Sequence, residues 1–177
     1  MRKMTLAGLF LAATVALGCG AGSGGSDAAG SAGTKSSGDD KPAEKAAKIG
    51  DPVRDGKFEF TVTKLKCGVA KVGGDFLEEK AQGQFCLVTV KVKNIAKEPQ
   101  YFSDSDQKGY APDGTEFSTD SEAGISANKD ASTIFTEINP GNQVTGVLVF
   151  DIPKKAKLAK LELHDSAFSG GVEVALS

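Results

Sequence analysis

Apolar and polar side chains alternate one by one in the central part of this chain, and this period of two constrains the fold more than any other feature. It is clearest in two runs whose apolar members are Phe58, Phe60 and Val62, and then Cys86, Val88, Val90 and Val92. Because successive side chains of a β-strand point to opposite faces, each run predicts a strand with one buried face. Shorter runs follow at Val144, Leu148, Phe150 and Ile152, at Leu161 and Leu163, and at Val172, Val174 and Leu176.

Turn sequences separate these runs: Asp55-Gly56, Gly73-Gly74, Pro112-Asp113-Gly114, Asn139-Pro140-Gly141 and Ser169-Gly170-Gly171. Proline fixes φ and glycine permits positive φ, so each of these segments favours a reversal of the chain. Many short strands without a long helical period predict an all-β fold, an immunoglobulin-like antiparallel β-sandwich over residues 49–177. The chain has no tryptophan, which excludes the Cys…Trp…Cys core of antibody domains.

The N-terminus has the features of an export signal. Arg2 and Lys3 precede an apolar run from Leu6 to Leu17, which is shorter than the ~20 residues of a membrane-spanning helix. The stretch Ala16-Leu17-Gly18-Cys19 resembles the lipobox of bacterial lipoproteins, with the first two residues in the reverse of the commonest order. We expect a signal peptide over residues 1–18 and a lipid such as palmitate on Cys19. The alternative is an ordinary cleaved signal beside a coincidental cysteine.

The segment that follows is predicted to be a flexible tether. Residues 20–38 are almost wholly Gly, Ser and Ala, a composition that cannot bury apolar surface. The tether region is residues 19–48, including the lipidated Cys19, and residues 20–48 as a flexible coil would hold the domain roughly 30 Å from the lipid anchor.

Charge argues against nucleic acid as a partner. The formal net charge is −2, and we find no basic cluster long enough for a nucleic-acid footprint. The nearest candidate is Lys154, Lys155, Lys157 and Lys160, which follow Pro153. We interpret them as part of a solvated connection.

The chain has three cysteines. If Cys19 carries lipid, Cys67 and Cys86 remain, and an even pair in an oxidising compartment predicts a disulfide. The closed loop of about 20 residues would contribute on the order of 3 kcal/mol by the chain-entropy estimate. Reactive thiols are the alternative, although no CxxC spacing or nearby histidine supports redox or metal chemistry.

Several segments together resemble a family of lipoproteins and secreted proteins of unknown function from Gram-positive bacteria, largely actinobacteria. They are Ile49-Gly50-Asp51, Val88-Thr89-Val90-Lys91-Val92-Lys93-Asn94, Pro112-Asp113-Gly114-Thr115, Ile138-Asn139-Pro140-Gly141-Asn142 and Val149-Phe150-Asp151-Ile152-Pro153. The family's domain is similar to the telokin-like, immunoprotective extracellular antigens of mycobacteria. The resemblance implies an exported immunoglobulin-like sandwich, and it brings no catalytic residues. The pair Cys67 and Cys86 belongs to only some of these relatives.

One candidate for catalysis surrounds His164, the single histidine. A triad with Asp165 and Ser166 would need the three side chains to converge. Adjacent residues of a strand point to opposite faces, so Asp165 is poorly placed to orient His164. We expect a strand-end turn here, with an envelope hydrolase as the weaker alternative.

The segment Asp104-Ser105-Asp106-Gln107-Lys108-Gly109 begins like a calcium loop. Lys108 replaces the expected third ligand, so only a partial cation site with Asp104, Asp106 and Asp113 remains as an alternative to a solvated acidic loop. One histidine and two bridged cysteines cannot furnish a zinc site. We expect no metal and no cofactor.

The sequence therefore predicts a protein held at the outer face of the cytoplasmic membrane by its lipid, or extracellular if shed. We expect a binding module without enzymatic activity, whose partner is an envelope protein, a small ligand or a polymer. A surface made of Tyr101, Phe102, Tyr110 and His164 is the candidate for contacting this partner. The alternative is a passive structural or antigenic surface protein.

Overall fold

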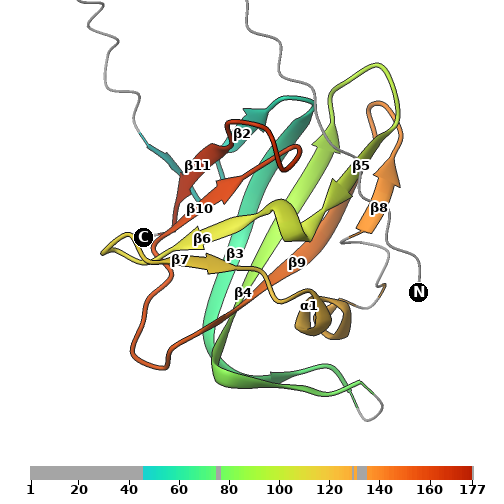
Figure 1. Cartoon of the computed structure of the whole chain (residues 1–177). Helices are drawn as coiled ribbons and strands as arrows, with labels where there is room; N and C mark the ends of the chain where they lie inside the picture. The colour runs from blue at the N-terminus through green and yellow to red at the C-terminus, as the bar shows by residue number, and fades with distance from the viewer. Residues whose placement is uncertain (1–45, 75–76, 129, 131–134, 177) are drawn as a thin grey trace, which may run out of the picture. The chain divides into compact units, whose positions relative to one another are not determined.

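The computed structural model describes residues 46–74, 77–128, 130 and 135–176, all of which belong to one unit, Lys41–Ser177. Two β-sheets pack face to face, and one short helix lies beside them (Figure 1). This confirms the β-sandwich predicted from the alternating pattern. Cys19, the expected signal peptide and most of the expected tether lie outside the described residues. Within the described part of the chain, no helix is long and apolar enough to cross a bilayer.

The first sheet has four antiparallel strands in the order β2-β3-β4-β9. They are β2 (Pro52–Asp55), β3 (Phe58–Val72), β4 (Glu79–Asn94) and β9 (Gln143–Ile152). Cys86, Val88, Val90 and Val92 of β4 are buried, as the sequence predicts, and Asn94 at the end of the strand is buried as well. The β3–β4 register shifts between Val62 and Lys64 and again between Lys66 and Val69. The first shift reverses the faces, so that Leu65 packs against the core and Lys64 points outward.

The second sheet has five strands in the order β1-β11-β10-β6-β7. They are β1 (Ala47–Lys48), β6 (Lys108–Tyr110), β7 (Glu116–Ser118), β10 (Lys160–Leu163) and β11 (Val172–Ala175). β1 runs parallel to β11, which departs from the predicted antiparallel arrangement, whereas the other neighbouring strands of this sheet are antiparallel. A parallel neighbour is accessible to β1 because it follows the tether and is not joined to β11 by a tight turn.

The core lies between the two sheets. Three rings meet there: Phe102 lies 6.0 Å from Phe58 in an edge-to-face contact and 6.3 Å from Phe60. Phe102 belongs to β5 (Gln100–Ser103), which pairs with β8 (Phe135–Ile138) in a separate two-stranded ribbon. This ribbon closes one side of the sandwich by contributing Phe102 and Ile138 to the core.

The helix α1 (Ser121–Ala127) is an element that the sequence did not predict. Asp120 caps it by accepting a hydrogen bond from the Ala123 amide at 2.9 Å. The helix covers one half of the outer face of the first sheet, where Ala123 packs in a small second core with Phe85 and Val149. Asn128, just after the helix, both donates to and accepts from the backbone of Val147 at 2.9 Å. The residue after the helix thereby provides hydrogen-bond partners for the Val147 backbone groups at the free edge of β9.

Candidate functional site

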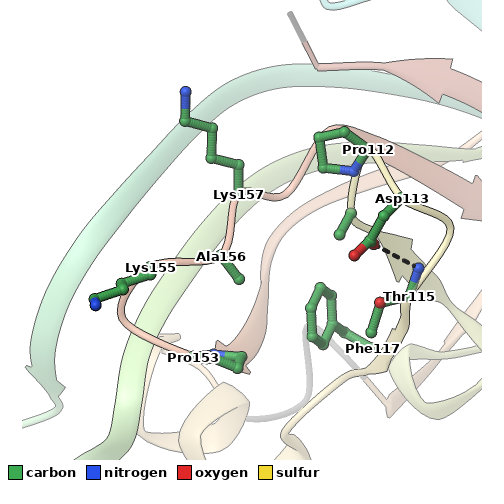
Figure 2. Close-up of a pocket in the computed structure, with 9 residues that line it drawn as sticks. Pro112, Asp113, Thr115, Phe117, Pro153, Lys155, Ala156 and Lys157 are labelled. Carbon is green, nitrogen blue, oxygen red and sulfur yellow. Dashed lines mark hydrogen bonds between the residues drawn. The ribbon is translucent and has the colours of Figure 1, made fainter.

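A cleft of about 480 Å³ opens between the β6–β7 turn and the connection that leads from β9 to β10 (Figure 2). Its floor and walls are mostly apolar and its rim is charged. The lining residues are Ala111, Pro112, Asp113, Thr115 and Phe117 on the side of the turn, and Pro153, Lys155, Ala156 and Lys157 on the side of the connection.

The wall formed by the turn is fixed by its own hydrogen bonds. The Ala111 amide donates to the Thr115 carbonyl at 2.9 Å, and Gly114 between them has a φ of 87°, which glycine adopts without strain. The Asp113 carboxylate accepts from the Thr115 amide at 3.0 Å. This bond lowers the pKa of Asp113 below its usual value, so Asp113 is ionised at neutral pH.

The opposite wall is held by a side chain from the first sheet. The Gln84 amide of β4 donates to the carbonyls of Pro153 at 3.2 Å, Lys154 at 3.0 Å and Ala156 at 3.2 Å. Leu158, two residues further on, is buried in the main core. Both walls are therefore ordered by contacts within the protein, and the cleft is formed before any ligand enters it.

The cleft combines an aromatic ring with charged side chains. Phe117 offers a half-buried ring inside it, and Lys155 and Lys157 extend from the rim in Figure 2. Neither lysine makes an ion pair with a described residue. The lining contains one hydroxyl, that of Thr115, and neither histidine nor cysteine. The arrangement can hold an apolar group, and its charged side chains are the Asp113 carboxylate and the two lysines, but it lacks the nucleophile and base pair of a hydrolase.

The structure contains the predicted disulfide between Cys67 and Cys86. Cys86 is fully buried on the inward face of β4, whereas Cys67 is exposed in the irregular segment between Lys66 and Val69. The bridge is thus a staple between neighbouring strands, with one sulfur in the core and the other at the surface.

The predicted surface of Tyr101, Phe102, Tyr110 and His164 is not assembled. Tyr101 is 64% exposed, but Phe102 is 2% exposed and His164 is 7% exposed. The expectation for Phe102 is wrong because Tyr101 and Phe102 are consecutive in β5 and so point to opposite faces. Only Tyr101 among the four is a free surface side chain.

Tyr110 lies within a polar network on the outer face of the second sheet. Its hydroxyl donates to Glu116 at 3.1 Å, and the Lys160 ammonium lies 4.9 Å from the ring centroid. Desolvation raises the pKa of Tyr110, and the carboxylates of Glu162 and Glu116 raise it further. The phenol therefore stays protonated and serves as a structural donor.

His164 is tied into the end of β10. Its Nδ1 lies 3.2 Å from the Ser169 hydroxyl, and its Nε2 lies 2.9 Å from Glu162, close enough for an ion pair but not aligned for a hydrogen bond. Ser166 instead donates to Asp165 at 3.0 Å. The arrangement of His164, Asp165 and Ser166 weighed from the sequence is therefore not formed, because these residues order their own loop.

The acidic segment is also occupied with local structure. Asp104 begins a short 3₁₀ helix, Asp104–Asp106, and is buried, whereas Asp113 lies in the β6–β7 turn. Burial raises the pKa of Asp104, and hydrogen bonds from the Ser121 hydroxyl and the Ser105 amide oppose the shift. Among the described residues, no group of three or more His, Cys, Asp and Glu side chains is arranged to hold a metal ion.

Sequence reasoning missed the cleft. Its two walls are about 40 residues apart along the chain, and Gln84 comes from a third strand. The available signals were the Pro112-Asp113-Gly114 turn and the lysines after Pro153, but nothing in either segment indicates that they face each other.

Fold and site together define a β-sandwich domain with a preformed apolar cleft. A profile of the family described as domain of unknown function DUF4352 matches residues 47–174, and the chain belongs to this family. The resemblance to a family of unknown function, expected from the sequence, is confirmed at this level.

Individual proteins are also similar to this chain. The uncharacterized protein YxkC of Bacillus subtilis is 36% identical over 120 residues, which are 64% of this chain and 66% of that protein. The match thus spans slightly less than two thirds of the relative's length. Among solved structures, the YjhA protein of Bacillus subtilis has a TM-score of 0.52 at 19% identity and covers 74% of this chain and 99% of its own. The secreted protein MPT63 of Mycobacterium tuberculosis has a TM-score of 0.53 at 15% identity, over 75% and 96%. At these identities the likeness concerns the fold.

Proposed function

We propose that this protein is a lipid-anchored binding module at the outer face of the cytoplasmic membrane. Its cleft would take a small ligand that carries an apolar group. The observation that carries this proposal is the cleft itself, whose apolar walls are ordered by Gln84 and by the turn at Asp113, and whose rim carries two lysines that form no ion pair with a described residue. Preformed apolar clefts with a few polar groups at the rim are typical of ligand sites.

The location rests on two features of the chain. The charged start, the apolar run and Cys19 support export followed by lipid attachment. The Cys67–Cys86 disulfide supports an oxidising compartment. A labelled fatty-acid analogue fed to cells should tag the wild-type protein, and Cys19→Ala should abolish the tag and release the protein into the medium. A Cys19→Ala protein that still carries the tag would contradict the anchor.

The binding site can be tested first with a model ligand. Anilinonaphthalene sulfonate combines an aromatic body with an anionic group, so its fluorescence should rise when it enters the cleft. Ala156→Trp should block the cleft and remove this signal, whereas Ala70→Trp, on an exposed part of β3, should leave it intact. Equal fluorescence from both variants would place the probe elsewhere and count against the cleft.

The natural ligand can be sought by photo-crosslinking in intact cells. A photoreactive amino acid at Thr115, which lines the cleft, should capture a ligand that the same amino acid at Ala70 does not. If both positions capture the same material, or neither captures any, the alternative of a passive surface protein is favoured. Turnover of an ester panel that His164→Ala abolishes would instead restore the hydrolase alternative.

A further inference from the structure

Half of the outer face of the first sheet remains uncovered by α1, and lysines gather there. Lys64 and Lys66 of β3 and Lys91 and Lys93 of β4 point outward, because the intervening residues of the same strands fill the core. We call these four residues the lysine face. None of their ammonium groups makes an ion pair or hydrogen bond with any part of the chain that the structure describes.

The strand register brings these charges close together. Lys64 pairs with Thr89, so it lies diagonally next to Lys91 on the same face. Such diagonal neighbours lie about 7–8 Å apart, and like charges at neighbouring positions destabilise a sheet. The acidic side chain nearest in the register, Glu59 opposite Lys93, is already bound to Arg54 at 2.7 Å. Within the described part of the chain, four positive charges are therefore left without an ion-pair partner, in a protein whose formal net charge is −2.

The outer face of the second sheet shows the contrasting arrangement. Lys108 pairs with Glu116 at 3.3 Å, and Lys160 forms an ion pair with Glu173. At these positions, the lysines of the second sheet are paired with carboxylates, whereas those of the lysine face are not. Carboxylates at neighbouring positions would relieve the repulsion among the four lysines. An anionic partner outside the chain would relieve it as well.

We propose that the lysine face docks on the anionic phospholipid surface of the membrane to which the protein is anchored. The inference rests on the proposed lipid anchor for its biological setting. A sheet face is broad and open, and the outward side chains beside the lysines are short and polar, namely Thr61, Thr89 and Thr145. Such a face suits a planar array of phosphates better than an enclosed ligand.

The point where the tether joins the domain supports this orientation. Ala46 and Ala47, where the described chain begins, line a hollow between the two sheets, together with Arg54 and Glu59 of the first sheet and Val172 and Glu173 of the second. An anchored chain therefore reaches the domain at an edge shared by both sheets, where Glu59 lies opposite Lys93 of the lysine face. Each lysine near an anionic surface contributes about fivefold in affinity, and the anchor makes this weak attraction an intramolecular one. Docking would hold the sandwich flat on the bilayer.

The test uses the chain from Gly20 onward, which lacks the lipid but keeps every described residue. Its binding to vesicles of phosphatidylcholine with phosphatidylglycerol is compared by sedimentation with binding to pure phosphatidylcholine. We expect binding only to the anionic vesicles and a steep loss with added salt, because screening weakens attraction between exposed charges. Equal binding to both vesicles, or none to either, would overturn the proposal. Fatty-acid labelling of Cys19 is independent of this assay, so failure of docking and failure of anchoring are distinguishable.

Two matched variants separate the face from net charge. Replacing Lys64, Lys66, Lys91 and Lys93 by Gln should reduce binding to anionic vesicles by on the order of several hundredfold. Replacing Lys57, Lys80, Lys97 and Lys154 by Gln removes the same charge from exposed positions outside both this face and the cleft and should change it by less than about threefold. Equal losses in both variants would overturn the proposal. So would binding of the wild type to soluble polyphosphate but not to the vesicles, because that result assigns the lysine face to a different anion.

Discussion

Asn94, at the end of β4, has a buried polar side chain. We expect its replacement to remove a large part of the protein's free energy of unfolding. Its side chain is 0% exposed. Its amide donates to the carbonyls of Glu98 at 2.8 Å and Ile138 at 2.7 Å, and its oxygen accepts from the Ala96 amide at 2.8 Å. One side chain thus forms hydrogen bonds with backbone groups of the β4–β5 loop and of the end of β8.

Asn94→Asp changes only the side-chain NH2 group and hardly alters the volume of the side chain. An oxygen then replaces the amide nitrogen and faces two carbonyl oxygens at the same distances. Two hydrogen bonds are lost, two carbonyls are left unpaired, and a carboxylate is buried without a cation, so we expect a loss of about 4 kcal/mol in the free energy of unfolding at neutral pH. Protonation restores one donor. The pKa of the new carboxyl is therefore raised in the folded state, and the deficit should shrink as pH falls toward the unfolded value of about 3.9.

Urea denaturation at neutral and acidic pH measures both effects. Asn142→Asp is the matched control, because Asn142 is exposed in the neighbouring turn and gains the same charge; it should lose less than about 0.5 kcal/mol. A loss below about 1 kcal/mol in Asn94→Asp, or a loss independent of pH, would show that the Asn94 amide does not carry these bonds.

Three further predictions concern other buried or constrained groups. Asp104→Asn should raise the free energy of unfolding by about 1 kcal/mol at neutral pH, because burial disfavours the ionised carboxylate and raises the pKa of Asp104. As pH falls and Asp104 becomes protonated, the wild type should become as stable as the variant, which urea titrations across pH will show. Reduction of the Cys67–Cys86 bridge, which spans 19 residues, should lower the free energy of unfolding by about 3 kcal/mol, and thiol titration of the unreduced, denatured domain should find neither cysteine free. Gly171→Ala should lower the free energy of unfolding by about 2–4 kcal/mol, since Gly171 has a φ of 70° and a Cβ there would lie 2.6 Å from the His164 ring. Thermal denaturation measures the loss, and an unchanged melting temperature would contradict the close packing of that loop.

The strands were predictable because burial on one face imposes a period of two over many residues. Phe58, Phe60 and Val62 are buried, and the Asn139-Pro140-Gly141 turn forms with Gly141 at a φ of 77°, both as predicted. Such features depend on residues close together in the chain, so their signal survives in a single sequence.

Other features could not be predicted, because they depend on residues far apart in the chain or on an element too short to show a pattern. Helix α1 has seven residues, too few for a helical period to show, and it persists because Ala123 packs on Phe85 and Val149. The exposure of Cys67 depends on the register shift beside it, which alternation alone cannot reveal. The cleft needs Gln84 to meet carbonyls 69 to 72 residues away, and nothing in the local pattern specifies that pairing.

Four side-chain amides explain how this sandwich orders its loops. Gln107 is 1% exposed, and its amide donates to the His164 carbonyl at 3.0 Å while its oxygen accepts from the His164 amide at 2.9 Å, as a neighbouring strand would. Asn128 does the same for Val147 on β9, whereas Gln84 and Asn94 satisfy carbonyls in the loops next to their strands. An amide can both donate and accept, so it replaces a missing strand without introducing a buried charge. The loops at the ends of the sheets, including one wall of the cleft, are consequently ordered by the domain itself, and a ligand that enters the cleft would not have to bear the entropy of ordering that wall.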